Sequence, residues 1–159
     1  MLLFEYAYLR SLCVLFISLI AMTSGLAQTT PHIGSTLTAS EMETAKTKTQ
    51  IQDGKRVLWV VSTGRSSSGP ITMLVNEQSV VGRSANEVVI ANSPTEQTKL
   101  RITSYLSKTV SIDYVDNMNI TVLRFSAIAD AAKAVAELRT AMPDARITLP
   151  VVYSIRRPS

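Results

Sequence analysis

Residues 109–125, TVSIDYVDNMNITVLRF, decide the fold. Apolar and polar side chains alternate from Thr109 to Val115, which is the period of a strand with one buried face. Asp116 and Asn117 are typical turn residues. Residues 119–125 return to β-branched and aromatic side chains. The spacing therefore predicts an antiparallel hairpin around residues 116–118.

A helix is predicted on each side of this hairpin. Upstream, Ser93 as cap, Pro94 and Glu96 form a start signal for a helix that we expect to run to about residue 107. Downstream, residues 127–141 form the clearest amphipathic segment of the chain. The first helix should have Leu100, Thr103 and Leu106 on one stripe, and the second should bury Ile128, Ala131, Val135, Leu138 and Met142.

One strand precedes the first helix, at residues 87–91, and one follows the second, at residues 146–153. The order β-α-β-β-α-β predicts an α+β, ferredoxin-like sandwich over residues 86–153, with two helices on one face of a four-stranded antiparallel sheet. The other face is open to solvent or to a partner. Candidates for this open face are Tyr114, Thr121 and Leu123, although a one-residue slip would exchange the two faces.

The residues before this unit are predicted to be simpler. Residues 55–85 read as a β-hairpin extension, with strands on either side of a Gly/Ser-rich loop at 64–70 and with Trp59 in the core. Residues 28–54 are rich in Ser and Thr, and their apolar residues follow no period. We expect a disordered polar leader there, with at most a helical turn at residues 40–48.

The first 27 residues read as an export signal. An uncharged apolar block, residues 11–22, follows Arg10 and has the length of a signal-peptide core, too short to span a bilayer. Cleavage is expected after Ala27, which gives a secreted or periplasmic protein; the alternative is an uncleaved anchor. Cys13, the only cysteine, would leave with the signal.

Composition argues against catalysis. The chain has 159 residues with one Cys, one His and a net charge of +4. The His, His32, falls in the predicted leader without nearby partner residues, so we expect no metal, no cofactor and no enzyme activity. Gly64 and Gly69 lack the Lys-Ser/Thr of a phosphate loop. Scattered basic residues without aromatic strand motifs predict no nucleic-acid partner, and after signal cleavage no membrane attachment is expected.

The β-α-β-β-α-β unit resembles the propeptide of subtilisin-like serine proteases and the related stand-alone inhibitors. The similarity includes the Ala-rich helix and the Pro143-Asp144 junction into the last strand. It departs from that family at residues 149–152 (LPVV), where an acidic residue and an Asn or Asp are missing. Because the sequence ends at Ser159 without a protease segment, we expect a stand-alone inhibitor, a separately encoded propeptide or a truncated precursor.

The resemblance implies a protease inhibitor or folding chaperone that is a monomer when free. The sheet face would pack on two helices of the protease, and Asp113 and Asp116 would cap those helices. The tail would lie along the active-site cleft as an extended strand. In this sequence the tail is Tyr153, Ser154, Ile155, Arg156 and Arg157, followed by Pro158 and Ser159.

A second resemblance leads to a different function. SPOR domains, which bind peptidoglycan, share the element order and the exported location, and residues 122–149 resemble the second half of such a domain. This alternative predicts cell-wall binding, for which aromatic side chains on the open face would be expected.

Overall fold

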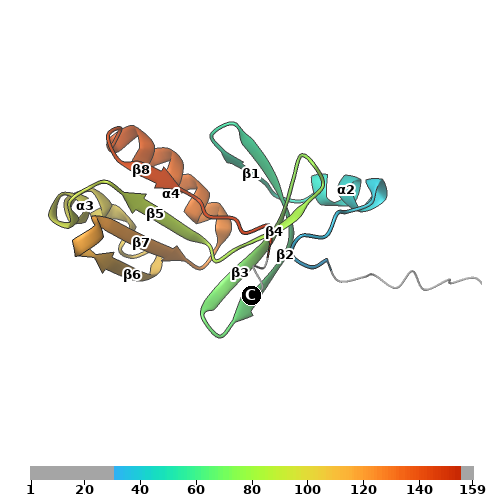
Figure 1. The fold of residues 1–159 in the computed structure, drawn as a ribbon, viewed down its shortest axis with the longest axis horizontal. Coiled ribbons are helices and arrows are strands. Elements are labelled where there is room, and N and C mark those ends of the chain that lie inside the picture. The colour runs from blue at the N-terminus through green and yellow to red at the C-terminus, as the bar shows by residue number, and fades with distance from the viewer. Residues whose placement is uncertain (1–30, 155–159) are drawn as a thin grey trace, which may run out of the picture. The chain divides into compact units, whose positions relative to one another are not determined.

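The computed structural model describes residues 31–154, which form two four-stranded antiparallel sheets with helices packed against them (Figure 1). The α+β class is therefore confirmed. The predicted signal peptide, residues 1–27, lies outside the described residues, as do Ile155, Arg156 and Arg157 of the predicted tail. Within residues 31–154, no helix has both the length and the apolar character needed to cross a bilayer.

The first sheet has the strand order β1-β2-β3-β4, and every neighbouring pair is antiparallel. The predicted hairpin is present as β2 and β3, but its strands continue to Ser66 and resume at Gly69, so the loop is shorter than residues 64–70. A strand on each side widens the hairpin into a sheet. The strands are β1 (Gln50–Asp53), β2 (Arg56–Ser66), β3 (Gly69–Asn76) and β4 (Val81–Ser84).

The prediction of a disordered leader at residues 28–54 is wrong for its described part. Helix α2 (Ala39–Lys46) and strand β1 form there. The helix begins with a capping box in which the Thr38 backbone N–H donates to the Glu41 carboxylate at 2.8 Å and the Thr38 hydroxyl accepts from the Glu41 N–H at 3.4 Å.

Residues 31–54 are ordered because they cover a second apolar face. Met42 and Ala45 of α2 are buried, and with Leu37 they pack against Val75 and Val81 of the first sheet. Trp59 is partly buried against the same cluster. Residues 28–54 contribute only three side chains to this cluster, and the first sheet contributes the others. Three apolar residues without a period are too few for the sequence pattern to predict the contact.

The second sheet has the strand order β6-β7-β5-β8, again with antiparallel neighbours. The predicted hairpin of residues 109–125 is confirmed, with Tyr114 opposite Thr121 and Ile112 opposite Leu123. The last strand ends at Thr148, two residues before Pro150, which cannot donate to a ladder. The strands are β5 (Glu87–Ala91), β6 (Thr109–Val115), β7 (Ile120–Phe125) and β8 (Arg146–Thr148).

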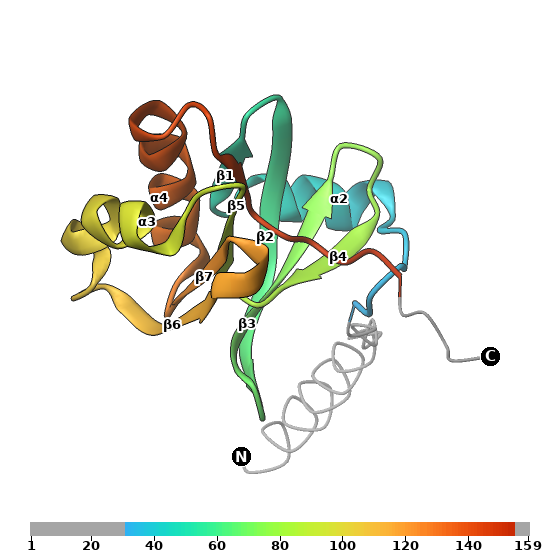
Figure 2. The same ribbon diagram turned by 60° about the vertical axis from the view of Figure 1, so that its left-hand side comes forward.

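Helices α3 (Thr95–Ile102) and α4 (Ile128–Ala141) lie on one side of the second sheet (Figure 2). The burial predicted for α4 and for Met142 after it is confirmed. Helix α3 differs from the prediction: it ends at Ile102, a 3-10 turn η1 (Thr103–Tyr105) follows, and Ser93 does not cap it.

The predicted stripe of α3 is also wrong. Leu100 is 80% exposed and Leu106 is 50% exposed, whereas Ile102 and Tyr105 are buried. Within α3 the buried side chains are Thr95, Thr98 and Ile102, which follow an ordinary helical period. The prediction chose the wrong face because the buried face carries two threonines, whereas the apolar Leu100 lies on the exposed one.

The two sheets share one apolar cluster. Ile51, Leu58 and Leu74 of the first sheet pack with Val88 and Ile90 of β5 and with the buried side chains of α4. The sequence predicted a hairpin extension at residues 55–85 and a separate unit at residues 86–153. The shared core shows instead that these two segments fold together.

A charge cluster around one buried carboxylate lies beside this core. The Asp53 side chain is 1% exposed and forms ion pairs with Arg56 and Arg139. Arg139, on α4, also donates two hydrogen bonds to the Ile147 carbonyl, at 2.9 and 3.1 Å. Arg56 donates to the Leu149 carbonyl at 3.3 Å. The turn between β1 and β2 is thereby joined to α4 and to the segment around β8.

Leu138→Ala should lower the free energy of unfolding by about 2–4 kcal/mol, because Leu138 is 1% exposed and its loss leaves a cavity at the contact of α4 with both sheets. Urea denaturation would measure the loss. Leu100→Ala, at the exposed position of α3, is the matched control and should change stability little; a loss below about 0.5 kcal/mol for Leu138→Ala would contradict this packing.

Tyr105 should make stability depend on pH in the alkaline range. The pKa of Tyr105 is raised to about 12, mainly by burial and also by the 2.6 Å hydrogen bond that its hydroxyl donates to Glu137. The folded state therefore holds this proton more tightly than the unfolded chain, so its contribution is complete below pH 10 and is lost as the pH rises toward 12. Urea unfolding at several pH values should show a steeper alkaline loss for the native chain than for Tyr105→Phe; equal slopes would contradict it.

Candidate functional site

Strand register decides which side chains of the second sheet face the helices. Thr121 is 1% exposed and Leu123 is fully buried, and both face α3 and α4. Tyr114, opposite Thr121, faces the same side. The prediction that these three residues belong to the open face is therefore wrong. A shift of one residue in the assumed facing accounts for the error.

The open face consists of the alternate residues, which form cross-strand rows. Val122 lies between Asp113 of β6 and Val89 of β5, and Thr148 of β8 extends this row. The next row contains Val115, Ile120, Ala91 and Arg146 in the same strand order.

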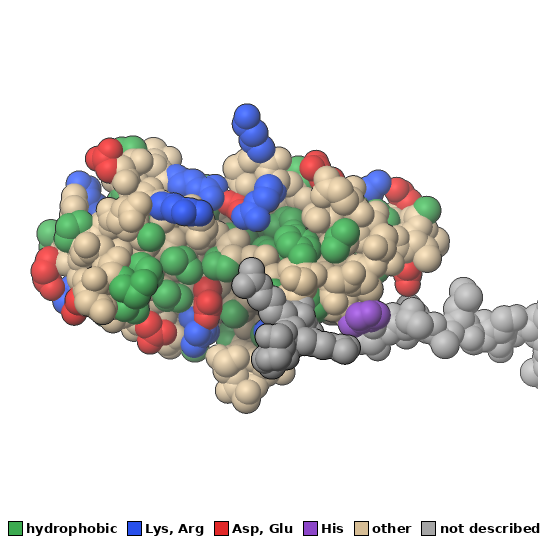
Figure 3. Space-filling view, in the orientation of Figure 1, with side chains coloured by type: hydrophobic (Ala, Val, Ile, Leu, Met, Phe, Trp, Pro, Cys, Tyr) green, Lys and Arg blue, Asp and Glu red, His purple; other side chains and the backbone are tan. Residues whose placement is uncertain are grey.

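The centre of this face is apolar and only partly covered. Val89, Ala91, Ile120 and Val122 are half-buried, Val115 is 37% exposed, and none of them belongs to either buried cluster. Figure 3 shows hydrophobic side chains together over the region of β5, β6 and β7, with charged side chains around them. Each row also has one charged end. Asp113 lies at the β6 end of the Val122 row, and Arg146 lies at the β8 end of the Val115 row.

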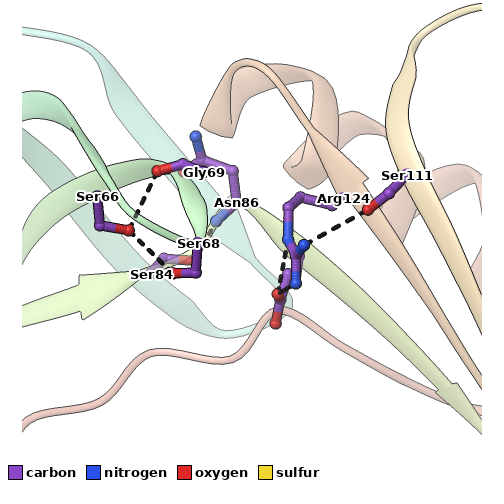
Figure 4. Close-up of polar contacts among 8 residues, drawn as sticks. Ser66, Ser68, Gly69, Ser84, Asn86, Ser111 and Arg124 are labelled. Atoms are coloured by element: carbon purple, nitrogen blue, oxygen red, sulfur yellow. Dashed lines mark hydrogen bonds and ion pairs between the residues drawn. The ribbon is translucent and has the colours of Figure 1, made fainter.

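One end of the open face is closed by a polar group (Figure 4). Arg124 of β7 donates through Nε to Glu87 of β5 at 2.9 Å, a second contact joins its Nη2 to the same carboxylate, and Nη1 lies 3.5 Å from the Ser111 hydroxyl of β6. A Cβ built at Gly69, at the end of the β2–β3 hairpin, would lie 3.5 Å from the Arg124 side chain. The hairpin end therefore borders the open face.

The link between the two sheets lies beside this polar group. Asn86 is buried with a φ of 57°, its N–H donates to the Ser84 hydroxyl at 3.2 Å, and its side chain donates to the Ser126 carbonyl at 3.3 Å. The Asn86 carbonyl accepts from the Phe125 N–H at 2.9 Å. These contacts fix the point where the chain crosses from β4 into β5.

The two predicted helix-capping acids have different surroundings. Asp113 is exposed on the open face, and its carboxylate has no hydrogen bond or ion pair within residues 31–154. Asp116 follows β6 and accepts a 2.6 Å hydrogen bond from Thr95, in the first turn of α3. Of the two, Asp113 has the carboxylate that is available to a partner.

The described part of the predicted tail packs on the first sheet. Val152 and Arg83 exchange two backbone hydrogen bonds, at 2.8 and 2.9 Å, along the edge of β4. The Tyr153 ring follows, lying over Gly82, and burial raises the pKa of its hydroxyl. Ser154 is exposed. Tyr153 is therefore held by β4, and any free tail starts after it.

The remaining candidate residues form no second site. His32 is exposed, and within residues 31–154 no three His, Cys, Asp or Glu side chains lie close enough together to hold a metal ion. A polar pocket of about 210 Å³ lies between the segment after β5 and the end of α4. Its lining includes Ser93, Arg101 and Asp144.

Comparisons with protein-family models, with curated proteins and with solved structures gave no match. The resemblance to propeptides and to SPOR domains stays a prediction. The geometry of the open face is therefore the basis for inferring function.

Gly82→Ala should release the C-terminal segment. A Cβ at Gly82 would lie 2.6 Å from the Val151 side chain and 2.8 Å from the Tyr153 ring, so those groups must move, at a cost of about 1–3 kcal/mol. Limited proteolysis near residue 153 and the melting temperature would both report the change. Gly64→Ala is the matched control, because its Cβ would have nothing nearer than 3.7 Å; equal effects of the two substitutions would contradict the close packing.

Proposed function

We propose that residues 87–148 form a ferredoxin-like unit whose open face binds a protein partner without catalysis. The partner we favour is a subtilisin-like serine protease, which the exported chain would inhibit or help to fold. The observation that carries the proposal is the group of partly exposed apolar side chains at the centre of the open face, which neither buried cluster includes.

The topology supports the ferredoxin-like assignment. The elements follow one another as β5-α3-β6-β7-α4-β8, and the strand order β6-β7-β5-β8 places the first strand of the unit in the interior of the sheet beside the third and the fourth. All three pairings are antiparallel. This order and these directions support the proposed split β-α-β arrangement.

The chemistry of the open face favours a protein over a glycan. Its apolar residues are aliphatic, and none of the face residues on β5, β6, β7 and β8 is aromatic. Sugar rings bind mainly by stacking on aromatic side chains, whereas aliphatic groups with a charged border suit a protein interface. The cell-wall alternative is therefore the weaker of the two.

Asp113 gives the face a means of recognising a helix. A helix N-terminus carries partial positive charge and unpaired N–H groups, which an exposed carboxylate can accept. Asp113 lies at the β6 end of the row that contains Val122 and Val89, so a partner helix packed on these valines would have its N-terminus within reach of the carboxylate. Asp116 would contribute less, because it already accepts from Thr95.

Fewer residues of the tail can enter an active-site cleft than the sequence implied. Because Tyr153 packs over Gly82, the segment that would enter an active-site cleft is Ser154 and the residues after it. Tyr153 would fix where that segment leaves the first sheet.

The decisive experiment is inhibition of purified subtilisin-like proteases by residues 28–159. Val122→Asp should weaken inhibition at least tenfold, because it places a charge at the centre of the apolar face. Leu100→Asp introduces the same charge at an exposed position of α3, away from that face, and should inhibit like the native chain.

Asp113→Asn and removal of residues 155–159 test the other two contacts, and each should weaken inhibition without lowering the melting temperature. Absence of inhibition across several such proteases would refute the protease partner. Sedimentation with purified peptidoglycan, lost on Val122→Asp, would instead support the cell-wall alternative.

A further inference from the structure

The polar pocket of about 210 Å³ is formed where two neighbouring strands leave the second sheet. Ala91, the last residue of β5, pairs with Arg146, the first residue of β8. The segments beyond this pair, residues 92–93 and 141–145, therefore lie close together and form two walls of the pocket. Drug-sized ligands occupy cavities of about 300–1,000 Å³, so this pocket fits a smaller molecule.

Opposite charges line this pocket without neutralising each other. Helix α3 forms a third wall through Gln97 and Arg101, which are four residues apart and share one helix face. Asp144 lies on the wall formed by the turn between α4 and β8. Both charged side chains are exposed, and neither forms an ion pair within residues 31–154. A ligand with one anionic and one cationic group would therefore give both of them a partner.

A buried hydroxyl adds a third polar contact to the pocket. Ser93 lines the pocket, is 5% exposed and accepts a 2.9 Å hydrogen bond from the Thr98 hydroxyl. This bond fixes the Ser93 oxygen, whereas the Ser93 proton has no acceptor within residues 31–154. Because a buried donor without a partner is destabilising, a ligand oxygen that accepts from Ser93 would bind favourably.

We propose that this pocket binds a free α-amino acid with a small side chain. The carboxylate of the amino acid accepts from the Arg101 guanidinium and the Ser93 hydroxyl, and its ammonium group donates to Asp144. The side chain is small because the apolar part of the lining consists of two alanines, a proline and Met142 around a small volume.

The two charges of the pocket select a zwitterion over a simple ion. Asp144 would repel an anion bound at Arg101, and Arg101 would repel a cation bound at Asp144. A peptide terminus carries only one of the two charges of an amino acid, so it would leave one of these side chains without a partner.

This site is separate from the open face of the second sheet. None of the residues that line the pocket belongs to the cross-strand rows of that face. Binding of an amino acid therefore does not depend on the proposed protein partner, and each can be tested without the other.

Amide NMR spectroscopy of 15N-labelled residues 28–159 tests the site, with L-alanine as the probe. L-Alanine should shift the amide signals of the pocket lining in a saturable way. N-acetyl-L-alanine lacks the ammonium group and L-alaninamide lacks the carboxylate. Each should bind at least about tenfold more weakly than L-alanine, which is the scale of one charge-assisted hydrogen bond.

Two variants identify which pocket charge contacts which ligand group. Asp144→Asn should weaken binding of L-alanine about tenfold and bind N-acetyl-L-alanine at least as tightly as the native chain does. Arg101→Gln should weaken binding of L-alanine similarly and bind L-alaninamide at least as tightly. Asp130→Asn and Lys133→Gln remove exposed charges of α4 outside the pocket lining, so these matched controls should bind L-alanine like the native chain.

The comparison of ligands uses the native chain, so it decides the question even where a variant fails to fold. Absence of saturable shifts with glycine, L-alanine and L-serine would overturn the proposal. Equal affinity for L-alanine and N-acetyl-L-alanine would also overturn it, because the ammonium group would then make no contact. Inorganic phosphate that binds more tightly than L-alanine would show an anion site instead of a site for a zwitterion.

Discussion

The structure depends on one contact, that of α4 with both sheets. Leu138 and its neighbours on α4 share a single apolar cluster with Leu58 of the first sheet and Val88 of the second. Each sheet alone would leave this face in water, and burial of aliphatic side chains is the main favourable term in folding. The Asp53 ion pairs lie next to this contact. Such buried pairs add orientation more than stability, so the apolar contact is the primary constraint.

This contact also determines which surface remains for binding. Because α3 and α4 occupy one face of the second sheet, the side chains on the other face have no covering element of their own. Val122 and Ile120 are left there, because along β7 they alternate with Thr121 and Leu123, which are buried on the helix side. The candidate site is thus a by-product of core formation, to which Asp113 and the Arg124–Glu87 pair add polarity.

Local patterns in the sequence predicted the second sheet well. The hairpin of residues 109–125 and the buried stripe of α4 follow from periods of two and about 3.6, which are properties of short segments. The sequence did not predict which side chains of each strand face the helices, because alternation alone does not distinguish the two faces of a sheet. The set that faces the helices is the one that shares a cluster with the buried side chains of α4 and with Ile102 and Tyr105. The sequence pattern had placed Ile102 and Tyr105 beside the stripe of α3.

Contacts between distant segments were beyond the sequence patterns. The ordering of α2 depends on Val75 and Val81, which lie far along the chain from Met42. Likewise, nothing in residues 149–153 indicates that they run along β4, since Gly82 provides the space for Tyr153 by lacking a side chain. Such features are set by the tertiary environment and carry little local signal.

The pairing of Arg83 with Val152 has a consequence for how the protein is made. The edge of β4 receives its partner from Val152, which the ribosome adds only after α4 and β8. Until then, the first sheet lacks both this strand partner and the α4 face of its core. A nascent chain would therefore carry an exposed edge while residues 85–151 are added, and long-range closure of this kind slows folding and favours association between incomplete chains. Closure of the first sheet thus waits for Val152, so a stop near residue 148 would leave the edge of β4 without its partner.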